Sequence, residues 1–297
     1  GAAFVADSGG PNAVVFSNNL IVGNESNTDN TPSSAGGGII VTLSNNVQIL
    51  NNRFEYQNIV QQNTDLNGSA LYLYEITGFS IEENTFTGNY GFSSISIRYG
   101  SDGQISQNKW WKNENYYNLE LVGDVRGDIF NNFFGKQIPT RLSRGGGSTN
   151  IYMHSDGISG HNDISIFFNT IAAANFGVVA GDYSDLMIFN NIFTGLDNSI
   201  NISGTNITSN ITKNLFYNNL INDHLGTGPV FADPNLVDIA SGDFHILPGS
   251  GAIDRAICGD FDEDIDGDFR PAGSGPTPCD IGADEFYYKI YLPIMLR

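Results

Sequence analysis

The sequence predicts an all-β solenoid, a parallel β-helix of about eight coils followed by an acidic C-terminal capping segment. Three observations predict it: a short phrase recurs at a near-constant step, alternating strand-like runs separate the phrases, and acidic residues gather near the C-terminal end. A repeat of this size cannot bury a core by itself, so successive repeats must stack. The chain is 40% hydrophobic, which supplies enough apolar side chains for a continuous core.

The repeated phrase places an apolar alternation before an Asn and another apolar residue after it, as in VQILNNRFEYQN and LMIFNNIFTGL. Eight asparagines anchor the phrases: Asn19, Asn52, Asn84, Asn108, Asn132, Asn169, Asn191 and Asn214. Subtracting neighbouring numbers gives steps of 33, 32, 24, 24, 37, 22 and 23 residues. One coil therefore takes 22–24 residues, and the three longer steps contain inserted loops.

Short runs between the phrases have the alternation of β-strands. They are GIIVTL at Gly38–Leu43, ALYLYE at Ala70–Glu75, SISIRYG at Ser94–Gly100 and NLELVGD at Asn118–Asp124. Alternating apolar and polar residues rich in Ile, Val and Tyr are typical of strands, and Gly and Asn interrupt every helical pattern. Each coil should contain two or three strands.

The recurring Asn has a structural role in this fold. We expect it at a corner between strands, in the left-handed conformation that Asn tolerates, with its amide in a ladder of hydrogen bonds along the axis. The apolar residue that follows should point inward and stack with its equivalents. These residues are Phe54, Phe86, Phe133, Ile171, Phe193 and Phe216, and Trp110 occupies the same slot.

Cys258 and Cys279, the only cysteines, are 21 residues apart and flank an acidic loop. An even count favours a disulfide in an extracellular protein.

Within the loop five aspartates alternate: Asp260, Asp262, Asp264, Asp266 and Asp268. The Asp-x-Asp-x-Asp-Gly stretch matches the first half of a calcium loop, so a structural Ca²⁺ is one prediction. Gly273 stands where an EF-hand has Glu, so an EF-hand is excluded. The alternative is a solvated acidic loop held by Arg255 and Arg270.

The repeat over Ala13–Asn219 resembles the right-handed parallel β-helix proteins of the pectate-lyase-like superfamily. The stretches DPNLVDIASGDFHILPGSGAIDRA, DGDFRPAG and DIGADEF are similar to the C-terminal segment of secreted bacterial proteins of the choice-of-anchor type, although Gly251 replaces the usual Pro. The last residues, YKIYLPIMLR, resemble a terminal motif of Chloroflexi-like bacteria. The resemblance implies a right-handed helix, a closing segment and an extracellular or cell-surface location, but no single reaction. We divide the chain into a β-helix (1–222), an acidic disulfide-stapled capping segment (223–286) and an apolar tail strand (287–297).

The formal net charge of −19 argues against nucleic acid as a partner, because the two would repel each other. No apolar stretch approaches the roughly 20 residues of a membrane-spanning helix. A neutral cell-surface glycan, a divalent cation or a second copy of the chain is a more compatible partner.

Two classes of function stay open at this level. As a structural or adhesive surface protein, the chain could assemble head to tail, with the C-terminal strand adding to the open N-terminal coil of a neighbour. Alternatively, it is a polysaccharide lyase, for which an Arg near acidic residues is required. The lyase candidates are Arg141, Arg144, His154 and Asp156 in the 37-residue step, then Arg98 with Asp102 and Asp124 with Arg126. The hydrolase residue set of the superfamily is missing from the sequence.

Overall fold

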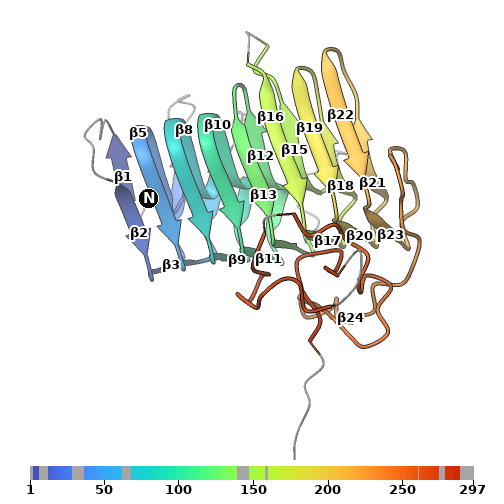
Figure 1. Ribbon diagram of the computed structural model, residues 1–297. Coiled ribbons are helices and arrows are strands. Elements are labelled where there is room, and N and C mark those ends of the chain that lie inside the picture. Colours follow the sequence, from blue (N-terminus) through green and yellow to red (C-terminus); the bar gives the residue numbers. More distant parts are fainter. Residues whose placement is uncertain are drawn as a thin grey trace, which may run out of the picture.

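The structure is a computed structural model that describes residues 3–6, 13–28, 37–61, 68–138, 147–157, 160–259, 261–273 and 278–287. The described residues form strands and turns without a helix, and the strands stack into a parallel β-helix (Figure 1). In Figure 1 the coils follow one another from the N-terminal end to β22. The predicted fold class is confirmed.

Each complete coil has three faces. The first and second faces belong to a 15-stranded sheet, and the third face is an 8-stranded sheet of two- or three-residue strands. The strands of the first two faces are β1 (Ala3–Ala6), β2 (Val14–Ser17), β4 (Glu25–Thr28), β5 (Ile39–Leu50), β7 (Asn58–Gln61), β8 (Gly68–Glu82), β10 (Tyr90–Ser106), β12 (Glu114–Val122), β13 (Arg126–Phe130), β15 (Thr149–His154), β16 (Asn162–Phe167), β18 (Phe176–Ala180), β19 (Ser184–Phe189), β21 (Asn198–Ile202) and β22 (Ile207–Thr212). The third face consists of β3 (Leu20–Val22), β6 (Arg53–Glu55), β9 (Thr85–Thr87), β11 (Lys109–Trp111), β14 (Phe133–Phe134), β17 (Thr170–Ala172), β20 (Ile192–Thr194) and β23 (Leu215–Tyr217).

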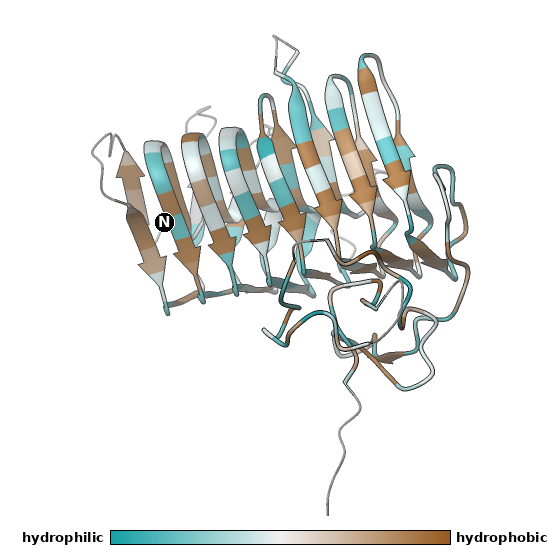
Figure 2. Cartoon of the chain, in the orientation of Figure 1, coloured by the Kyte–Doolittle hydropathy of each residue, from teal (hydrophilic) through white to brown (hydrophobic). Residues whose placement is uncertain are grey.

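The coils stack in register, so equivalent residues face the core in every coil. Ile97 pairs with Leu121, and Leu121 pairs with Met153; all three are at most 1% exposed. Figure 2 shows the result as apolar and polar bands that continue from strand to strand. Successive residues of a strand point to opposite faces, so the neighbours of these core residues point outward.

An apolar stack lines the inside of the third face. It runs through Ile21, Phe54, Phe86, Trp110, Phe134, Ile171, Phe193 and Phe216. Ring centroids lie 5.0 Å apart for Phe54–Phe86 and for Phe86–Trp110, and 4.4 Å apart for Trp110–Phe134. The prediction of Phe133 in this stack is wrong, because Phe134 lies two residues after its asparagine and pairs with Trp110. Phe133 packs in a separate cluster with Phe244.

The asparagine ladder is confirmed at all eight positions. Each asparagine from Asn19 to Asn191 donates its backbone N–H and its Nδ2 to Oδ1 of the next one, over distances of 2.8–3.1 Å. From Asn52 onward Nδ2 also donates to a strand carbonyl of the preceding coil, such as Ile105 for Asn132. The ladder thereby satisfies backbone groups that the corner would leave buried without partners.

The predicted backbone conformation of the ladder residues is wrong. The left-handed residue is the one before each ladder asparagine, for example Asn51 at φ 50° and Lys213 at φ 56°. The chain turns at that residue, and the next residue can then direct its amide inward. This preceding position accepts Glu, Gln, Phe and Lys as well as Asn, so the ladder and not the turn requires the repeated Asn.

A second polar ladder lies at the corner after the third face. Asn24 donates to Gln57, whose backbone N–H donates to Asn89 Oδ1, and Asn89 donates to Asn113. These residues end the sequence phrases, but their role was not predicted.

The acidic segment begins by covering the last coil. Isolated parallel bridges pair Ile221 with Asn198, Thr227 with Thr212 and Val230 with Leu215. The chain then forms the antiparallel pair β24 (Leu236–Asp238) and β25 (Asp243–Ile246) and runs back along the outside of the helix, beside β17, β14 and β11 (Figure 1).

Outward-facing side chains at the ladder corner dock this returning segment. Phe130, Phe167 and Phe189 stack outside the core at 5.0–5.1 Å, and the Phe261 ring lies 4.3 Å from Phe167. The left-handed corner residues Gln107, Asn131 and Asn190 donate to backbone carbonyls of Asp264, Glu263 and Ile257. The segment is therefore both an end cover and a lateral strap, which we call the strap (residues 231–287).

Candidate functional site

The outer side of the first face carries a cleft of about 380 Å³ over β10, β12 and β15. Its lining residues are Phe92, Arg98, Tyr117, Glu120, Val122, Tyr152, His154, Ser155 and Asp156. A neighbouring cleft of about 400 Å³ shares Phe92, Tyr117 and Tyr152 and extends toward β18 and β21. The two form one continuous surface feature, which we call the first-face cleft.

Strand alternation creates this cleft. Because Leu119 and Leu121 face the core, Glu120 points outward, and the register places it beside Ser96 and Tyr152. The next outward row is formed by Arg98, Val122 and His154, which pair in the same way.

Glu120 is the most unusual residue of the cleft, because it is only 1% exposed although it points away from the core. Its carboxylate accepts hydrogen bonds from Ser96 Oγ at 2.8 Å and Ser93 Oγ at 3.3 Å, and His154 Nε2 lies 3.4 Å away. A buried carboxylate requires such partners. The group can supply a fixed negative charge or a proton acceptor at the floor of the cleft.

His154 and Asp156 are held at the rim. His154 Nδ1 lies 3.0 Å from the carbonyl oxygen of Ser155, so this contact requires a proton on Nδ1 and leaves Nε2 facing Glu120. The Tyr99 hydroxyl donates to the Asp156 carboxylate, and this bond raises the pKa of Tyr99 to about 12.

Aromatic rings form the walls of the cleft. The rings of Tyr117 and Tyr152 stack with centroids 4.3 Å apart, and the Phe92 ring meets Tyr117 edge-on at 5.2 Å. Tyr72 and Tyr74 continue the aromatic surface on β8. Burial is the main cause of the raised pKa values of Tyr72 and Tyr152, so both hydroxyls stay protonated at neutral pH.

The structure brings some of the sequence candidates together and separates others. His154, Asp156 and Arg98 line the same cleft, whereas Arg141 and Arg144 lie outside the described residues. Asp102 lies on another face, because the left-handed residues Tyr99 and Asp102 turn the chain between the first and second faces. Sequence analysis missed Glu120. The signal was an acid at an outward position inside the run NLELVGD.

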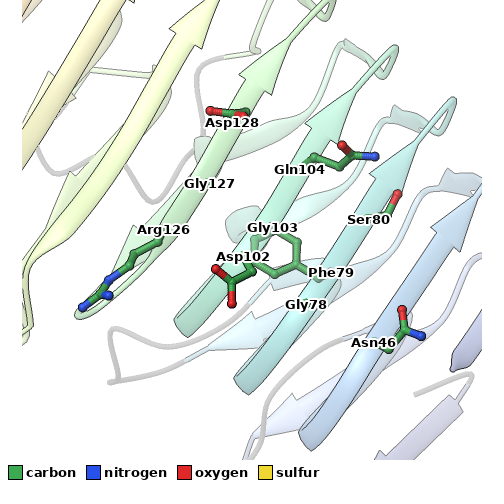
Figure 3. Close-up of a pocket in the computed structure, with 10 residues that line it drawn as sticks. All are labelled: Asn46, Gly78, Phe79, Ser80, Asp102, Gly103, Gln104, Arg126, Gly127 and Asp128. Atoms are coloured by element: carbon green, nitrogen blue, oxygen red, sulfur yellow. The ribbon is translucent and has the colours of Figure 1, made fainter. Parts of the chain in front are cut away.

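Asp102 contributes to a second, polar groove of about 490 Å³ on the second face (Figure 3). Asn46, Ser80, Gln104, Arg126 and Asp128 also line it. The groove exists because glycines remove side chains there: a Cβ on Gly103 would overlap the Phe79 ring, as the position of that ring in Figure 3 indicates. The predicted pair of Arg126 with Asp124 forms at 3.1 Å, but both side chains are about half exposed and stabilise the fold little.

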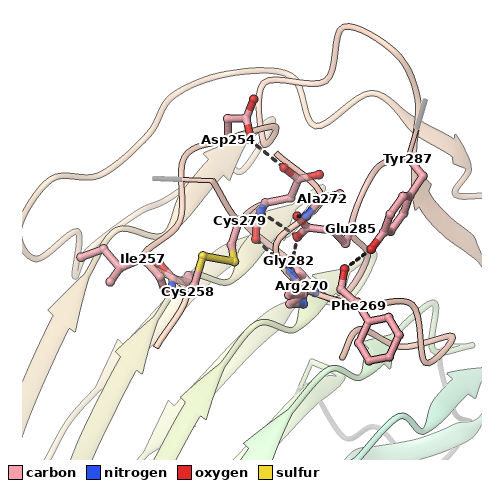
Figure 4. Close-up of a disulfide and its surroundings, with 12 residues drawn as sticks. Asp254, Ile257, Cys258, Phe269, Arg270, Ala272, Cys279, Gly282, Glu285 and Tyr287 are labelled. Carbon is pink, nitrogen blue, oxygen red and sulfur yellow. Dashed lines mark hydrogen bonds and ion pairs between the residues drawn. A yellow bond between two sulfur atoms is a disulfide. The ribbon is translucent and has the colours of Figure 1, made fainter. Parts of the chain in front are cut away.

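The strap buries one arginine at its centre (Figure 4). Arg270 bonds Glu285 at 2.9 Å and the carbonyls of Asp280 and Gly282, and its guanidinium lies 4.5 Å from the Phe168 ring centroid. Of the two arginines predicted to hold the acidic loop, Arg270 is buried in it and Arg255 is exposed.

The predicted disulfide joins Cys258 to Cys279 (Figure 4). One end of the disulfide follows Ile257, whose carbonyl accepts a hydrogen bond from the corner residue Asn190. The other end begins the stretch that contains Glu285. This covalent link is consistent with an extracellular setting.

Of the five alternating aspartates, Asp260 lies outside the described residues. Asp264 is buried, and its carboxylate accepts backbone N–H bonds from Asp266, Asp268 and Glu285 at 2.9–3.0 Å. Asp262 and Asp268 are exposed. The loop conformation is therefore held by a carboxylate that already has three donors.

A different group could hold a metal ion. Donor atoms of His245, Asp266 and Asp284 all lie within 4.8 Å of one another. The bond from His245 to Asp266, 2.6 Å long, raises the pKa of the imidazole to about 9 and lowers that of Asp266 to about 2. No spacing in the sequence indicates this group, because Asp266 and Asp284 are distant from His245 along the chain.

A scan against protein-family models finds no match for this chain, and a search of curated proteins finds no match either. The class that the structure establishes is a parallel β-solenoid with a disulfide-linked lateral strap. The described part of the chain contains no helix that is long and apolar enough to cross a membrane.

Proposed function

We propose that this chain is an extracellular, adhesive or structural β-helix that binds a cell-surface glycan in the first-face cleft. The aromatic walls carry the proposal: Tyr117 and Tyr152 stack on a rigid sheet beside Glu120 at the floor of the cleft, and Arg98 and His154 line the same cleft. Aromatic faces pack on the apolar faces of sugar rings, and fixed polar groups bond their hydroxyls. The strong net negative charge favours a neutral glycan over a polyanionic one.

Binding to arrayed neutral polysaccharides, followed by calorimetry with the best ligand, tests the proposal. Tyr152→Ala should weaken binding about tenfold, because one ring face is lost from the cleft. Tyr183→Ala is the matched control, since Tyr183 is 41% exposed and does not line the cleft. Equal affinities of the two variants, or no glycan binding by the parent chain, would contradict the proposal.

Polysaccharide cleavage is the second candidate, and the burial of Glu120 beside His154 favours it. An Arg, a His and two carboxylates in one cleft are the groups that proton abstraction or general acid catalysis would use. The formation of unsaturated uronate, followed by ultraviolet absorbance, tests for a lyase. The activity should disappear in Arg98→Lys if Arg98 is the base.

Head-to-tail assembly stays a prediction, because the tail Tyr288–Arg297 lies outside the described residues. In the first coil the outward side chains Phe4 and Leu20 are 68% and 61% exposed, which supports a contact there. Negative-stain electron microscopy of the chain with and without residues 288–297 tests the assembly. If both chains appear only as single rods, the assembly prediction is wrong.

Calcium binding by the acidic segment is likewise a proposal. Asp262 and Asp268 remain exposed and could take part, and calcium-dependent protection of the loop in hydrogen exchange would support it.

A further inference from the structure

The strap contains a compact donor group formed by three segments that are separate in sequence. His245 belongs to β25, Asp266 to the acidic loop and Asp284 to the closing stretch. Their donor atoms lie within 4.8 Å of one another, and His245 Nε2 is 2.6 Å from Asp266 Oδ2. This spacing allows all three atoms to approach one small cation after minor adjustment.

Neighbouring groups orient these donors. Asp243 Oδ1 lies 2.5 Å from His245 Nδ1, so the proton on Nδ1 is held there and Nε2 faces the two carboxylates. The Ile246 N–H donates to Asp284 Oδ2 at 2.7 Å and fixes that carboxylate, which is only 8% exposed. A carboxylate behind a histidine is the arrangement that supports metal-ligating imidazoles.

The charges of the group also favour a cation. Three carboxylates (Asp243, Asp266 and Asp284) surround one imidazole, and Lys109 of β11 lies 3.3 Å from Asp266 Oδ1. Even with a protonated imidazole, the negative charges outnumber the positive ones in a partly buried site.

We propose that His245, Asp266 and Asp284 bind a divalent transition-metal ion, for which zinc is the ion to test. Imidazole nitrogen with two carboxylates suits zinc and its neighbours, whereas calcium takes six to eight oxygen ligands. Three protein ligands leave a fourth tetrahedral position for water. The ion would connect β25, the acidic loop and the closing stretch, and so would stabilise the folded conformation of the strap. This site is independent of the first-face cleft.

The test uses the full chain with its disulfide intact, stripped of metal with EDTA and dialysed. Calorimetry with Zn²⁺ should show one ion bound per chain at a site that needs His245, and the melting temperature should rise by several degrees with Zn²⁺. Any stabilisation by Ca²⁺ should be the same in His245→Gln as in the parent chain. Co²⁺ should give the visible absorption of a four-coordinate site. His245→Gln should abolish these effects, and Asp243→Asn should weaken Zn²⁺ binding tenfold or more.

His161→Gln is the matched control, because His161 lies 2.9 Å from Asp185 on the surface and belongs to no group of three possible metal donors among the described residues. This variant should bind Zn²⁺ like the parent chain. Three outcomes would overturn the proposal: no uptake of Zn²⁺, unchanged uptake of Zn²⁺ by His245→Gln, or a stabilisation by Zn²⁺ that His245→Gln retains in full. Because circular dichroism of His245→Gln reports whether it folds, a loss of binding can be separated from a loss of structure.

Discussion

Replacement of one interior ladder residue, Asn132→Ala, should destabilise the β-helix strongly. The Asn132 Oδ1 accepts the backbone N–H of Asn108 at 2.9 Å and its Nδ2 at 3.1 Å. The Asn132 Nδ2 donates to the carbonyls of Ile105 and Phe130 and to Asn169 Oδ1, all at 2.8–2.9 Å. Alanine removes these five bonds at a position that is 0% exposed.

The magnitude follows from the groups that lose their partners. The Asn108 N–H stays buried and its acceptor is gone, which costs about 1–3 kcal/mol by itself. The carbonyl of Ile105 loses a donor as well, although water or small shifts can compensate part of that loss. We therefore expect the free energy of unfolding to fall by about 2–4 kcal/mol.

Position along the ladder provides an internal comparison. Asn19 stands at the N-terminal end and is exposed. Alanine at this position removes only the Nδ2 donor to Asn52 Oδ1, because the backbone N–H of residue 19 still donates, and no buried N–H loses its acceptor. Asn19→Ala should therefore cost less than about 1 kcal/mol. Asn210→Ala, at an exposed outward position of β22, should stay within about 0.5 kcal/mol of the parent chain.

Urea unfolding followed by circular dichroism and by tryptophan fluorescence measures these differences. Both probes are needed, because a solenoid can unfold in parts and the two-state treatment would then fail. If Asn132→Ala and Asn19→Ala cost the same, the ladder does not act through buried backbone groups and the reasoning is refuted.

Two further predictions concern the strap. Phe261→Ala removes the ring that covers Phe167, so it should lower the local free energy of opening of the strap by about 2–3 kcal/mol and increase hydrogen exchange there, with little change in the β-helix. Phe231→Ala is the control, because its ring is 63% exposed. A uniform change in exchange over the whole chain would argue against local docking. Burial is the main cause that raises the pKa of Asp280 to about 7, above its ordinary value of 3.8, and the nearby negative charge of Glu285 adds to the effect. The folded chain therefore binds more protons than the unfolded chain between about pH 4 and pH 7, and stability should fall as the pH rises through this window, by at most about 4 kcal/mol. Arg270 opposes this effect, and the raised pKa values of Asp264 and Glu285 add to it. Thermal melts in EDTA from pH 4 to pH 8 measure the slope, and a slope unchanged in Asp280→Asn would exclude Asp280 as its source.

The regular part of the fold could be predicted because each repeat contains the residues that determine the structure of its own coil. The steps of 22–24 residues, the ladder asparagines and the inward aromatic slot are local patterns that stacking repeats coil after coil. The errors were local as well. Phe133 was assigned the slot of Phe134, and the left-handed turn was assigned to the ladder asparagine instead of the residue before it.

The candidate sites were less accessible to sequence analysis. His154 and Asp156 were named from their long insertion, but Glu120 comes from the preceding coil and joins His154 through the stacking register. His245, Asp266 and Asp284 meet because the strap folds back on itself. Neither contact has a fixed spacing in the chain.

The sequence by itself therefore determined the all-β solenoid, the number of coils, the ladder and the disulfide, because nearest-neighbour stacking translates a local period directly into structure. Only the tertiary structure decided where the acidic segment lies, which outward side chains share a cleft and which carboxylates are buried. The physical reason is that these features depend on contacts between non-repeated segments. The outward Phe130–Phe167–Phe189 row and the buried Arg270 select the path of the strap, and no local pattern encodes either contact.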